Sequence, residues 1–536
     1  MPSPMPQSSE SEESLFQNTS RRWIYNETLR LKERYVRFNI PELMQVATAA
    51  ANTRHCVRIE KLAEGGFNKI FLLTMDNEYE VIARIPTPIA GPPHYTTASE
   101  VATMDFLRNI LEIPVPRVLA YCSTADNPVG AEYIIMERLR GESLASRFLE
   151  LPTNKVKGLM MQLVGMEEKI FSYNFPAYGS LYYANDVPES LSVPLPNEKW
   201  FCIGPISKRA FWFDERQDMD VDRGPWTTPQ DAITAAARRE SLWLAKFAKP
   251  QRRQTFSLST EEPLNPTEHD SLLNKYLMIS PFLIPKDEDL CKPILRHPDL
   301  SLGNIILVPD SNKVLSLIDW QDAAILPLFM QAGYPAFCEH ELAIPQSMKP
   351  PELPEEFDNL SDTDKQQVWA GHRLEEANLY YNAATQLGNK LHFKAFQMPS
   401  IGLLQYLISQ SGMPWDADFI NLKMSLVHVS QSWDKFSAED CPILFTPEEQ
   451  KKALDDATEW NESAAILTQM RDGMGIDIEG GTEPENLEFA MHINQGLRTE
   501  TVRHSEKHER ELAWRTWPFK DDDDTSPMPD VDSVEP

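Results

Sequence analysis

The chain has 536 residues, which is long enough to bury a sizeable core and to form more than one lobe. Its formal net charge of -29 argues against binding to nucleic acid or to an anionic membrane, since both need a basic surface. No apolar run is long enough to predict a transmembrane helix. The six cysteines include no Cys-x-x-Cys pair, which predicts reduced thiols rather than disulfides or a zinc site.

Composition changes along the chain and predicts six segments. A Ser/Pro/Glu-rich beginning and an Asp- and Pro-rich end favour disorder, because neither can bury enough apolar surface to fold. The expected segments are a disordered lead (1–14), a helical prelude (15–54), a β-rich lobe (55–139), a larger lobe with an insertion (140–354), a helical extension (355–515) and a disordered acidic tail (516–536).

The β-rich lobe begins with three apolar runs between Val57 and Ile85, separated by turn residues. They predict a three-stranded meander with Gly65 and Gly66 in its first turn. Glycines at such a turn let backbone amides approach phosphate oxygens closely. Paired glycines also suit a simple hairpin turn, so this signal is weak by itself.

The first part of the larger lobe contains one well-marked helix and several large aromatic residues. Thr228 followed by Pro229 is a typical helix start, and the helix should end near Pro250. Aromatic side chains in such a segment can wall a pocket for a small molecule, although large aromatic side chains suit a core as well. The candidate pocket walls are Trp200, Phe211, Trp212 and Trp226.

The densest cluster of chemically useful residues lies between residues 294 and 320. Asp299 and Asn304 stand five residues apart, and Asp319 follows fifteen residues later, behind a second apolar run. Phosphoryl transfer from a nucleotide needs a carboxylate that takes the proton of the acceptor hydroxyl, and oxygen ligands that hold magnesium on the phosphates. The apolar runs flank a Pro-Asp-Ser-Asn-Lys turn and predict a hairpin, which would bring Asn304 and Asp319 to one cleft.

Two other interpretations of this segment stay open from the residues alone. The triplet His297-Pro298-Asp299 also occurs in the J-domain of co-chaperones, but there helices flank it, whereas here a predicted strand follows. Asp and Asn can also occur by chance in an ordinary turn. The His297 imidazole fits a group that braces the loop by hydrogen bonding better than it fits a catalyst.

The residues His297–Ile305 and Leu317–Trp320 resemble the catalytic and metal-binding segments of aminoglycoside phosphotransferase-like kinases. The resemblance implies an α+β, bilobal protein-kinase-like fold with a small β-rich N-lobe, a larger helical C-lobe and a helical C-terminal extension. Members more often carry Gly after the His, so Pro298 departs from the pattern while the functional positions remain. The resemblance also implies ATP and Mg2+ as the nucleotide and metal.

The same resemblance assigns roles to individual residues. Those implied are the catalytic Asp299 with His297 beside it, the magnesium ligands Asn304 and Asp319, and the nucleotide-binding residues Gly65, Gly66, Arg84, Glu100, Glu137 and Leu139. Arg84 stands where the family normally carries a phosphate-binding lysine; it keeps the charge but differs in reach and geometry. Glu100 should pair with that cation, although Thr97-x-x-Glu100 also reads as a capping box.

From about residue 15 to 515 the chain resembles one subgroup, the fungal altered-inheritance-of-mitochondria kinase-like proteins. The segments that carry this resemblance are Arg22-Trp23, Glu64–Asn68, Ala90–His94, Arg223–Trp226 and the catalytic segment. The resemblance implies an intracellular, mitochondrial location. The acidic N-terminus lacks a secretory signal and a visible basic presequence, which predicts a cytoplasmic location if that absence is decisive.

These patterns predict an ATP- and Mg-dependent kinase that acts on the hydroxyl of a small molecule. A protein acceptor is disfavoured because no activation segment with Ala-Pro-Glu follows the metal residue. The negative charge permits a cationic substrate, although a solvated acidic surface explains it too. The alternative is a weak or inactive kinase-fold scaffold with a protein partner, which Arg84 and Pro298 favour.

Overall fold

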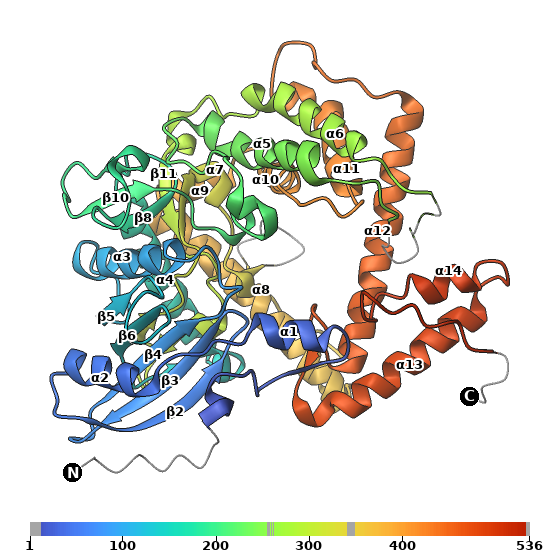
Figure 1. Ribbon diagram of the computed structural model, residues 1–536. Helices are drawn as coiled ribbons and strands as arrows, with labels where there is room; N and C mark the ends of the chain where they lie inside the picture. The colour runs from blue at the N-terminus through green and yellow to red at the C-terminus, as the bar shows by residue number, and fades with distance from the viewer. Residues whose placement is uncertain (1–11, 254–257, 259, 261, 340–348, 532–536) are drawn as a thin grey trace.

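The computed structural model describes residues 12–253, 258, 260, 262–339 and 349–531. Two lobes and a long C-terminal arm make up this part of the chain (Figure 1). Within the described residues, no helix combines the length and apolar character needed to cross a bilayer.

The N-lobe is a five-stranded antiparallel sheet with a helix on each face. In pairing order its strands are β2 (Cys56–Glu64), β3 (Asn68–Met75), β4 (Glu80–Pro86), β6 (Tyr133–Glu137) and β5 (Val118–Cys122). Ile135 of β6 packs with Leu43 of α2 (Ile40–Ala50), whereas its neighbour Ile134 faces the side of α3 (Tyr95–Asn109). Successive strand residues point to opposite faces, so the sheet separates α2 from α3. The predicted meander is confirmed.

The C-lobe is mainly helical and is built around two long helices that lie against each other, α4 (Thr153–Phe171) and α8 (Asp362–Gly388). Its other helices are α5 (Pro229–Phe247), α6 (Pro266–Ile279), α7 (Leu328–Gln331), α9 (Lys390–Phe396), α10 (Ile401–Gln410) and α11 (Ile420–Gln431). The core they share includes Trp320 and Phe329, both fully buried. The helix predicted after Thr228 is confirmed as α5, whose first turn Thr228 caps by accepting from the Asp231 N–H at 3.2 Å.

Several short strands lie in the C-lobe, and some of them hold the catalytic segment in place. They are β7 (Glu142–Ser143), β8 (Ser180–Tyr183), β9 (Val193–Pro194), β10 (Phe201–Gly204), β11 (Pro293–Arg296), β12 (Ile305–Leu307), β13 (Val314–Leu317) and β14 (Ala324–Pro327). Strands β12 and β13 pair antiparallel with Ile305 opposite Leu317, so the predicted hairpin is confirmed. Strand β14 pairs with β11, which fixes the segment after Asp319 next to the one before Asp299.

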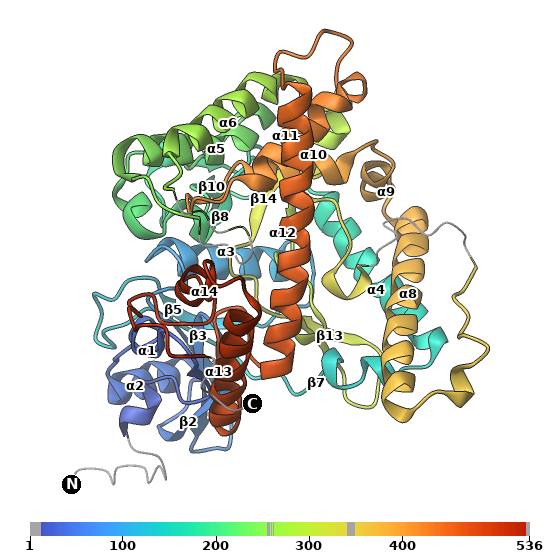
Figure 2. The same ribbon diagram turned by 90° about the vertical axis from the view of Figure 1, so that its right-hand side faces the viewer.

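The C-terminal arm returns from the C-lobe to the N-lobe. It consists of α12 (Pro447–Met474), β15 (Gly481–Thr482), α13 (Leu487–His504) and α14 (Arg510–Arg515). Helix α12 starts beside α11 and runs down to α13, which lies at the level of the N-lobe sheet (Figures 1 and 2). The capping box of Thr446 and Glu449 and the left-handed Gly475 (φ 67°) define the ends of α12.

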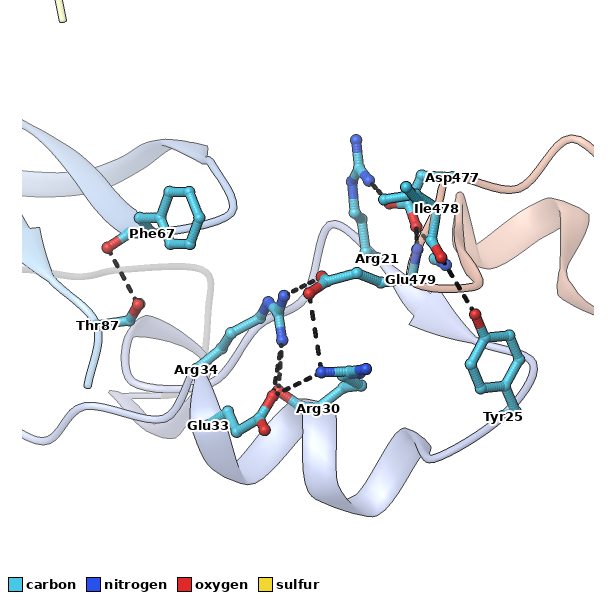
Figure 3. A network of polar contacts seen from close by, with 11 residues as sticks. Arg21, Tyr25, Arg30, Glu33, Arg34, Phe67, Thr87, Asp477, Ile478 and Glu479 are labelled. Carbon is cyan, nitrogen blue, oxygen red and sulfur yellow. Dashed lines mark hydrogen bonds and ion pairs between the residues drawn. The ribbon is translucent and has the colours of Figure 1, made fainter. Parts of the chain in front are cut away.

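The arm is clasped to the N-terminal prelude. Strand β15 pairs antiparallel with β1 (Arg22–Trp23), and Glu479 forms an ion pair with Arg34, just after α1 (Glu27–Glu33) (Figure 3). Arg34 is only 2% exposed, and its guanidinium also lies 4.9 Å from the centre of the Trp23 ring. The prelude therefore contains a strand as well as the expected helices, because its partner strand comes from the far end of the chain.

Both predicted disordered ends differ from expectation where the structure describes them. Residues 12–14 of the predicted disordered lead belong to a 3-10 helix, Glu12–Leu15. In the predicted acidic tail, Trp517 and Phe519 are 2% and 4% exposed and pack under α12 and α13. The prediction of disorder followed from the Asp-rich composition of this segment. Its few aromatic side chains nevertheless provide enough apolar surface to pack against the arm. Residues 1–11 and 532–536 lie outside the described part of the chain.

Candidate active site

A cleft of about 560 Å3 lies between the two lobes and gathers most of the predicted site residues. Predicted residues that line it are Gly65, Arg84, Glu100, Glu137, Leu139, Asn304 and Asp319. Apolar side chains of Ile82 and Met136 on the N-lobe side and of Ile306 and Ile318 on the C-lobe side complete its walls. Gly66, His297 and Asp299 are not part of this lining.

The glycine turn between β2 and β3 is open on the side of the cleft. The Gly65 N–H donates to the Asn68 carbonyl at 3.0 Å, and a Cβ atom added to Gly66 would meet nothing within 4 Å. Neither glycine has a positive φ, so the turn itself does not require glycine. Their absence of side chains leaves the space above the cleft free for another molecule. The hydroxyl of Thr87, the residue after β4, donates to the carbonyl of Phe67 at 3.0 Å (Figure 3).

Glu64, at the end of β2, joins this turn to the N-terminal segment. Its carboxylate accepts from Lys69 Nζ at 2.8 Å, Lys61 Nζ at 2.9 Å and the Thr19 N–H at 2.8 Å. Burial alone would raise the pKa of Glu64, but these hydrogen bonds and charges outweigh it and lower the pKa to about 2. Glu64 therefore lines the cleft as an ionised group whose carboxylate is held by these donors.

Arg84 on β4 reaches three acceptors and is 6% exposed. It forms an ion pair with Glu100, donates to Gln321 Oε1 at 2.6 Å and lies 3.2 Å from Asp319 Oδ1. The structure thus brings together the cation, the helix glutamate and the C-lobe carboxylate predicted from sequence. Burial raises the pKa of Glu100 to about 7, even though Arg84 opposes that shift.

The capping-box alternative for Glu100 is wrong. Helix α3 begins at Tyr95, so Glu100 lies in its second turn instead of at the third position after the cap. The Thr97 hydroxyl donates to Glu132 instead, at 2.5 Å. With its carboxylate 3% exposed and directed at Arg84, Glu100 has the position that the resemblance implies.

His297 braces the catalytic loop through both ring nitrogens. Its Nε2 lies 2.9 Å from the Ile318 carbonyl, and its Nδ1 accepts from the Asp299 N–H at 3.2 Å. Burial lowers the pKa of His297 to about 4, so the ring is neutral and Nε2 carries the proton. The resemblance places His297 beside the catalytic base. In the structure it is a positioning residue, because both ring nitrogens are hydrogen-bonded to backbone groups, those of Ile318 and Asp299.

Asp299 and Asn304 lie together in the loop, as their spacing predicts. Asn304 Nδ2 donates to the Asp299 carbonyl at 2.9 Å and to its Oδ2 at 3.2 Å. The Ile318 N–H donates to the Asn304 carbonyl at 3.0 Å, which connects this loop to Asp319. Asp319 itself adopts a left-handed conformation (φ 65°), and half of its side chain is exposed. This backbone conformation, unusual for a residue other than glycine, turns the carboxylate away from the hairpin and into the cleft.

The donor set of Asn304 and Asp319 fits magnesium. An amide oxygen and a carboxylate oxygen are hard ligands, and magnesium in kinases takes one or two such protein ligands together with phosphate oxygens and water. No group of three His, Cys, Asp or Glu side chains in the described ranges forms a metal cage of its own. The two-residue set is thus suited to a metal that arrives with a nucleotide.

The segment that links the lobes offers backbone groups to the cleft, not the Glu137 side chain. Glu137 Oε1 accepts from the Arg117 N–H at 2.8 Å and from Arg108 at 3.1 Å. No hydrogen bond engages the Leu139 N–H within the described part of the chain. Leu139 therefore presents both an apolar side chain and a free donor at the rim of the apolar walls.

Two residues that sequence reasoning missed lie next to Asp319. Gln321 is 8% exposed and connects Arg84, Asn68 and the Ala90 carbonyl, the last two at 2.7 and 2.5 Å. Asp322 is a half-buried carboxylate whose pKa is raised to about 6 by burial, with the charge of Lys208 opposing that shift. Its Oδ1 has no hydrogen-bond partner among the described residues. The sequence signal that could have identified Asp322 is the Asp-x-x-Asp spacing of Asp319 and Asp322 after the hairpin.

The bilobal fold and this arrangement of residues in the cleft are those of a kinase-like phosphotransferase. The chain belongs to the phosphotransferase enzyme family, whose model matches residues 58–330, just over half of the chain. The match covers the glycine turn, Arg84, Glu100 and the whole catalytic segment.

Two fungal proteins illustrate the similarity to known sequences. A subtelomeric hrmA-associated cluster protein of Aspergillus fumigatus is 49% identical over 506 residues, which cover 89% of this chain and 99% of that protein. Altered inheritance of mitochondria protein 9, mitochondrial, of Clavispora lusitaniae is 26% identical over 495 residues, 81% of this chain and 80% of that protein. The resemblance to the altered-inheritance-of-mitochondria subgroup is confirmed.

Solved structures resemble the chain more distantly. A putative aminoglycoside phosphotransferase from Ralstonia eutropha is 14% identical with a TM-score of 0.36, over 80% of this chain and 99% of that one. A streptomycin-ATP complex of an aminoglycoside phosphotransferase is 12% identical with a TM-score of 0.35, over 73% and 96%. The fold assignment therefore rests on the family match and on the topology described above.

Proposed function

We propose that this protein transfers the γ-phosphate of ATP, in the presence of magnesium, to the hydroxyl of a small molecule. One observation carries the proposal. Asn304 donates to Asp299 and accepts from the N–H of Ile318, the residue before Asp319. Arg84 contacts Asp319 at 3.2 Å from the opposite wall of the cleft. A carboxylate for the acceptor, ligands for the metal and a cation for the phosphates are the parts that this chemistry needs.

The nucleotide would lie along the N-lobe wall of the cleft. Ile82, Met136 and Leu139 supply apolar contacts for a base, and the Leu139 N–H supplies a donor for its edge. Arg84 supplies positive charge to the phosphates, supported by Glu100. The open glycine turn above them leaves room for phosphate oxygens.

Asn304 and Asp319 would hold magnesium through their side-chain oxygens. When bound, magnesium neutralises charge on the transferred phosphate and its leaving group. The Asn304 Nδ2 atom stays engaged with Asp299, so the same amide orients the base and presents its oxygen to the metal.

Asp299 is the candidate general base. It is exposed, Asn304 and His297 fix its position, and its Oδ1 has no hydrogen-bond partner among the described residues. Oδ1 would accept the hydroxyl proton as the acceptor oxygen forms a bond to the γ-phosphorus. The bond from that phosphorus to the bridging oxygen breaks, and ADP leaves with the electron pair.

A second candidate function is an interaction scaffold with little or no turnover. The observation that favours it is that Arg84 is already bound by Glu100, Gln321 and Asp319. Measuring background ATP hydrolysis by the full chain and by Asp299→Asn separates the two. Hydrolysis that depends on Asp299 supports the enzyme, whereas equal, negligible hydrolysis in both proteins supports the scaffold.

A mitochondrial location is part of the proposal and is supported by the printed name of the Clavispora lusitaniae relative. Fractionation of cells that express the full chain at its natural level tests it. Recovery with the cytosolic marker alone would contradict the mitochondrial assignment.

A further inference from the structure

An arginine of the C-lobe lies against the tip of the glycine turn. The guanidinium of Arg209 is 5.4 Å from the centre of the Phe67 ring, a distance at which the face of an aromatic ring attracts a cation. Arg209 begins η5 (Arg209–Phe211), a short 3-10 helix between β10 and α5. Phe67 follows Gly65 and Gly66 in the N-lobe. The contact therefore connects the turn that borders the proposed nucleotide site with the C-lobe.

The donors of Arg209 are unused and accessible. Within the described part of the chain, no hydrogen bond or ion pair engages its guanidinium, which carries five N–H groups. Arg209 is half-buried, and none of its nitrogens is among the enclosed polar atoms that lack a partner. In contrast, Arg84 is already bound by Glu100, Gln321 and Asp319. Arg209 can therefore bind an anion without breaking an existing hydrogen bond.

The backbone that carries Arg209 is held by hydrogen bonds on both sides. The Arg209 carbonyl accepts from the Trp212 N–H at 2.9 Å and from the Phe213 N–H at 3.1 Å. Ser207, two residues earlier, is 1% exposed, and its N–H donates to Ser180 Oγ on β8 at 3.1 Å. A donor placed by such a fixed segment needs little reorganisation when a ligand arrives.

Three of the four aromatic residues predicted to wall a pocket support this segment. Phe211 and Trp226 are buried with ring centres 5.9 Å apart, and both line a cavity of about 320 Å3 inside the C-lobe. Trp212 stacks on Tyr95 of α3 at 5.0 Å. Trp200, in contrast, is 66% exposed. The aromatic packing around η5 therefore fixes the position from which the Arg209 side chain extends.

The contact between Arg209 and the turn lies at the metal end of the cleft. Asn68, the residue after Phe67, donates to Gln321 Oε1 at 2.7 Å. Gln321 stands two residues after the candidate magnesium ligand Asp319. A nucleotide whose base lies near Leu139 and whose phosphates meet magnesium would have its terminal phosphate at this end, next to the tip of the turn.

The charges around Arg209 are mixed. Burial raises the pKa of Asp322 to about 6, and the charges of Lys208 and Arg209 oppose this shift, which shows that the three groups are neighbours. No ion pair joins either cation to Asp322 among the described residues. Asp322 therefore balances part of the positive charge from a distance, while the N–H groups of Arg209 stay open to a second anion.

We propose that Arg209 is a further catalytic residue, which donates to oxygens of the γ-phosphate of ATP. The inference rests on the proposed phosphotransferase function. A planar guanidinium matches two phosphate oxygens, and it would stabilise them while the phosphorus exchanges the bridging oxygen for the acceptor oxygen. Phe67 orients the guanidinium through its ring face and leaves the N–H groups free. Arg84 would serve the phosphates nearer the base, as the strand cation does in protein kinases.

The test compares two nucleotides that differ by the terminal phosphate. Titration calorimetry on the full chain measures the affinities for Mg-ADP and for the magnesium complex of the β,γ-imido analogue of ATP, which is not hydrolysed. Arg209→Gln should weaken the triphosphate about tenfold, the effect of one charge-assisted hydrogen bond, and leave Mg-ADP unchanged. Arg209→Lys keeps the charge and should retain most of the preference for the triphosphate. Arg238→Gln, exposed on α5, is the matched control and should change neither affinity.

Two further measurements ask whether Arg209 acts in the reaction and through Phe67. Background ATP hydrolysis should fall about 10²–10³-fold in Arg209→Gln, the usual cost of removing one donor to the charge of a transition state. Phe67→Leu should weaken the triphosphate but not Mg-ADP, and it should add no further loss in the Arg209→Gln background. An additive loss would contradict the orienting role of Phe67.

The outcomes separate this proposal from the proposed function. Equal weakening of both nucleotides in Arg209→Gln, or no weakening of either, would contradict a contact with the γ-phosphate. In the second case an acidic group of the acceptor is the remaining partner for Arg209. If the triphosphate alone is weakened but no protein hydrolyses ATP or transfers its phosphate, the contact stands and the proposed function fails. If the wild type binds neither nucleotide, both proposals are wrong.

Discussion

Arg84 Nη2 lies 3.2 Å from Asp319 Oδ1, so the cation of the N-lobe and the carboxylate of the C-lobe loop are connected across the cleft. A nucleotide with magnesium would draw these two groups to different partners, the phosphates and the metal. Binding of Mg-ATP must therefore break this contact. We expect substitutions of Arg84 to change the affinity for Mg-ATP.

We expect ATP to stabilise the protein only when magnesium is present, because Asn304 and Asp319 need the metal to engage the phosphates. Ligand linkage predicts about 2.7 kcal/mol at a ligand concentration one hundred times Kd. Thermal melts of the full chain with ATP, with magnesium and with both measure this effect. Equal melting temperatures in all three conditions would contradict nucleotide binding.

Arg84→Ala should weaken Mg-ATP binding, because it removes the positive charge nearest the phosphates. Arg84→Lys should keep or improve turnover, since lysine is the usual residue of the family at this position. Titration calorimetry for affinity and an ATP hydrolysis assay for turnover check both parts. An alanine variant that binds Mg-ATP like the wild type would remove Arg84 from the site.

Asp299→Asn should fold, bind Mg-ATP about normally and lose roughly 10²–10⁴-fold in turnover, as expected for a general base. Asp310→Asn is the matched control, since Asp310 is exposed in the β12–β13 turn with a left-handed φ of 55° that asparagine tolerates. Background ATP hydrolysis by the three proteins gives the comparison. Full turnover in Asp299→Asn would exclude it as the base.

Glu479→Gln should destabilise the clasp between the C-terminal arm and the prelude. Arg34 would keep its buried position and its 3.4 Å contact with Glu33 but lose the Glu479 carboxylate, and a hydrogen-bonded charge in such a place contributes about 1–3 kcal/mol. Urea denaturation measures the change, and Glu485→Gln, an exposed residue on the same arm, is the control. Equal midpoints for both variants would show that the clasp contributes nothing to stability.

Glu64 should make stability fall in acid. Its pKa is about 2 in the folded protein and 4.5 as the ordinary value, so its contribution is present above pH 4.5 and is lost as the pH falls toward 2. The difference corresponds to at most about 3 kcal/mol. Unfolding free energies at pH 3 and pH 6 should differ more for the wild type than for Glu64→Gln, and identical pH profiles would refute the assignment.

Local sequence was sufficient for the catalytic segment. His297, Asp299, Asn304 and Asp319 lie within 23 residues, and a turn between two apolar runs leaves few ways to fold them. The Arg84–Glu100 pair was also within reach, because the strand and the helix that carry it follow each other directly. In these cases the order of elements along the chain already limits which side chains can meet.

Tertiary structure alone decided the remaining features. Arg34 and Glu479 are 445 residues apart, and no local pattern says that β1 and β15 pair or that Trp517 is buried in an acidic tail. The contacts of Gln321 with Arg84, Asn68 and the Ala90 carbonyl are equally invisible in sequence, because whether a polar atom finds a partner depends on every element that surrounds it. Hydrophobic periodicity determines which face of an element is buried, but only the packed structure determines what that face meets.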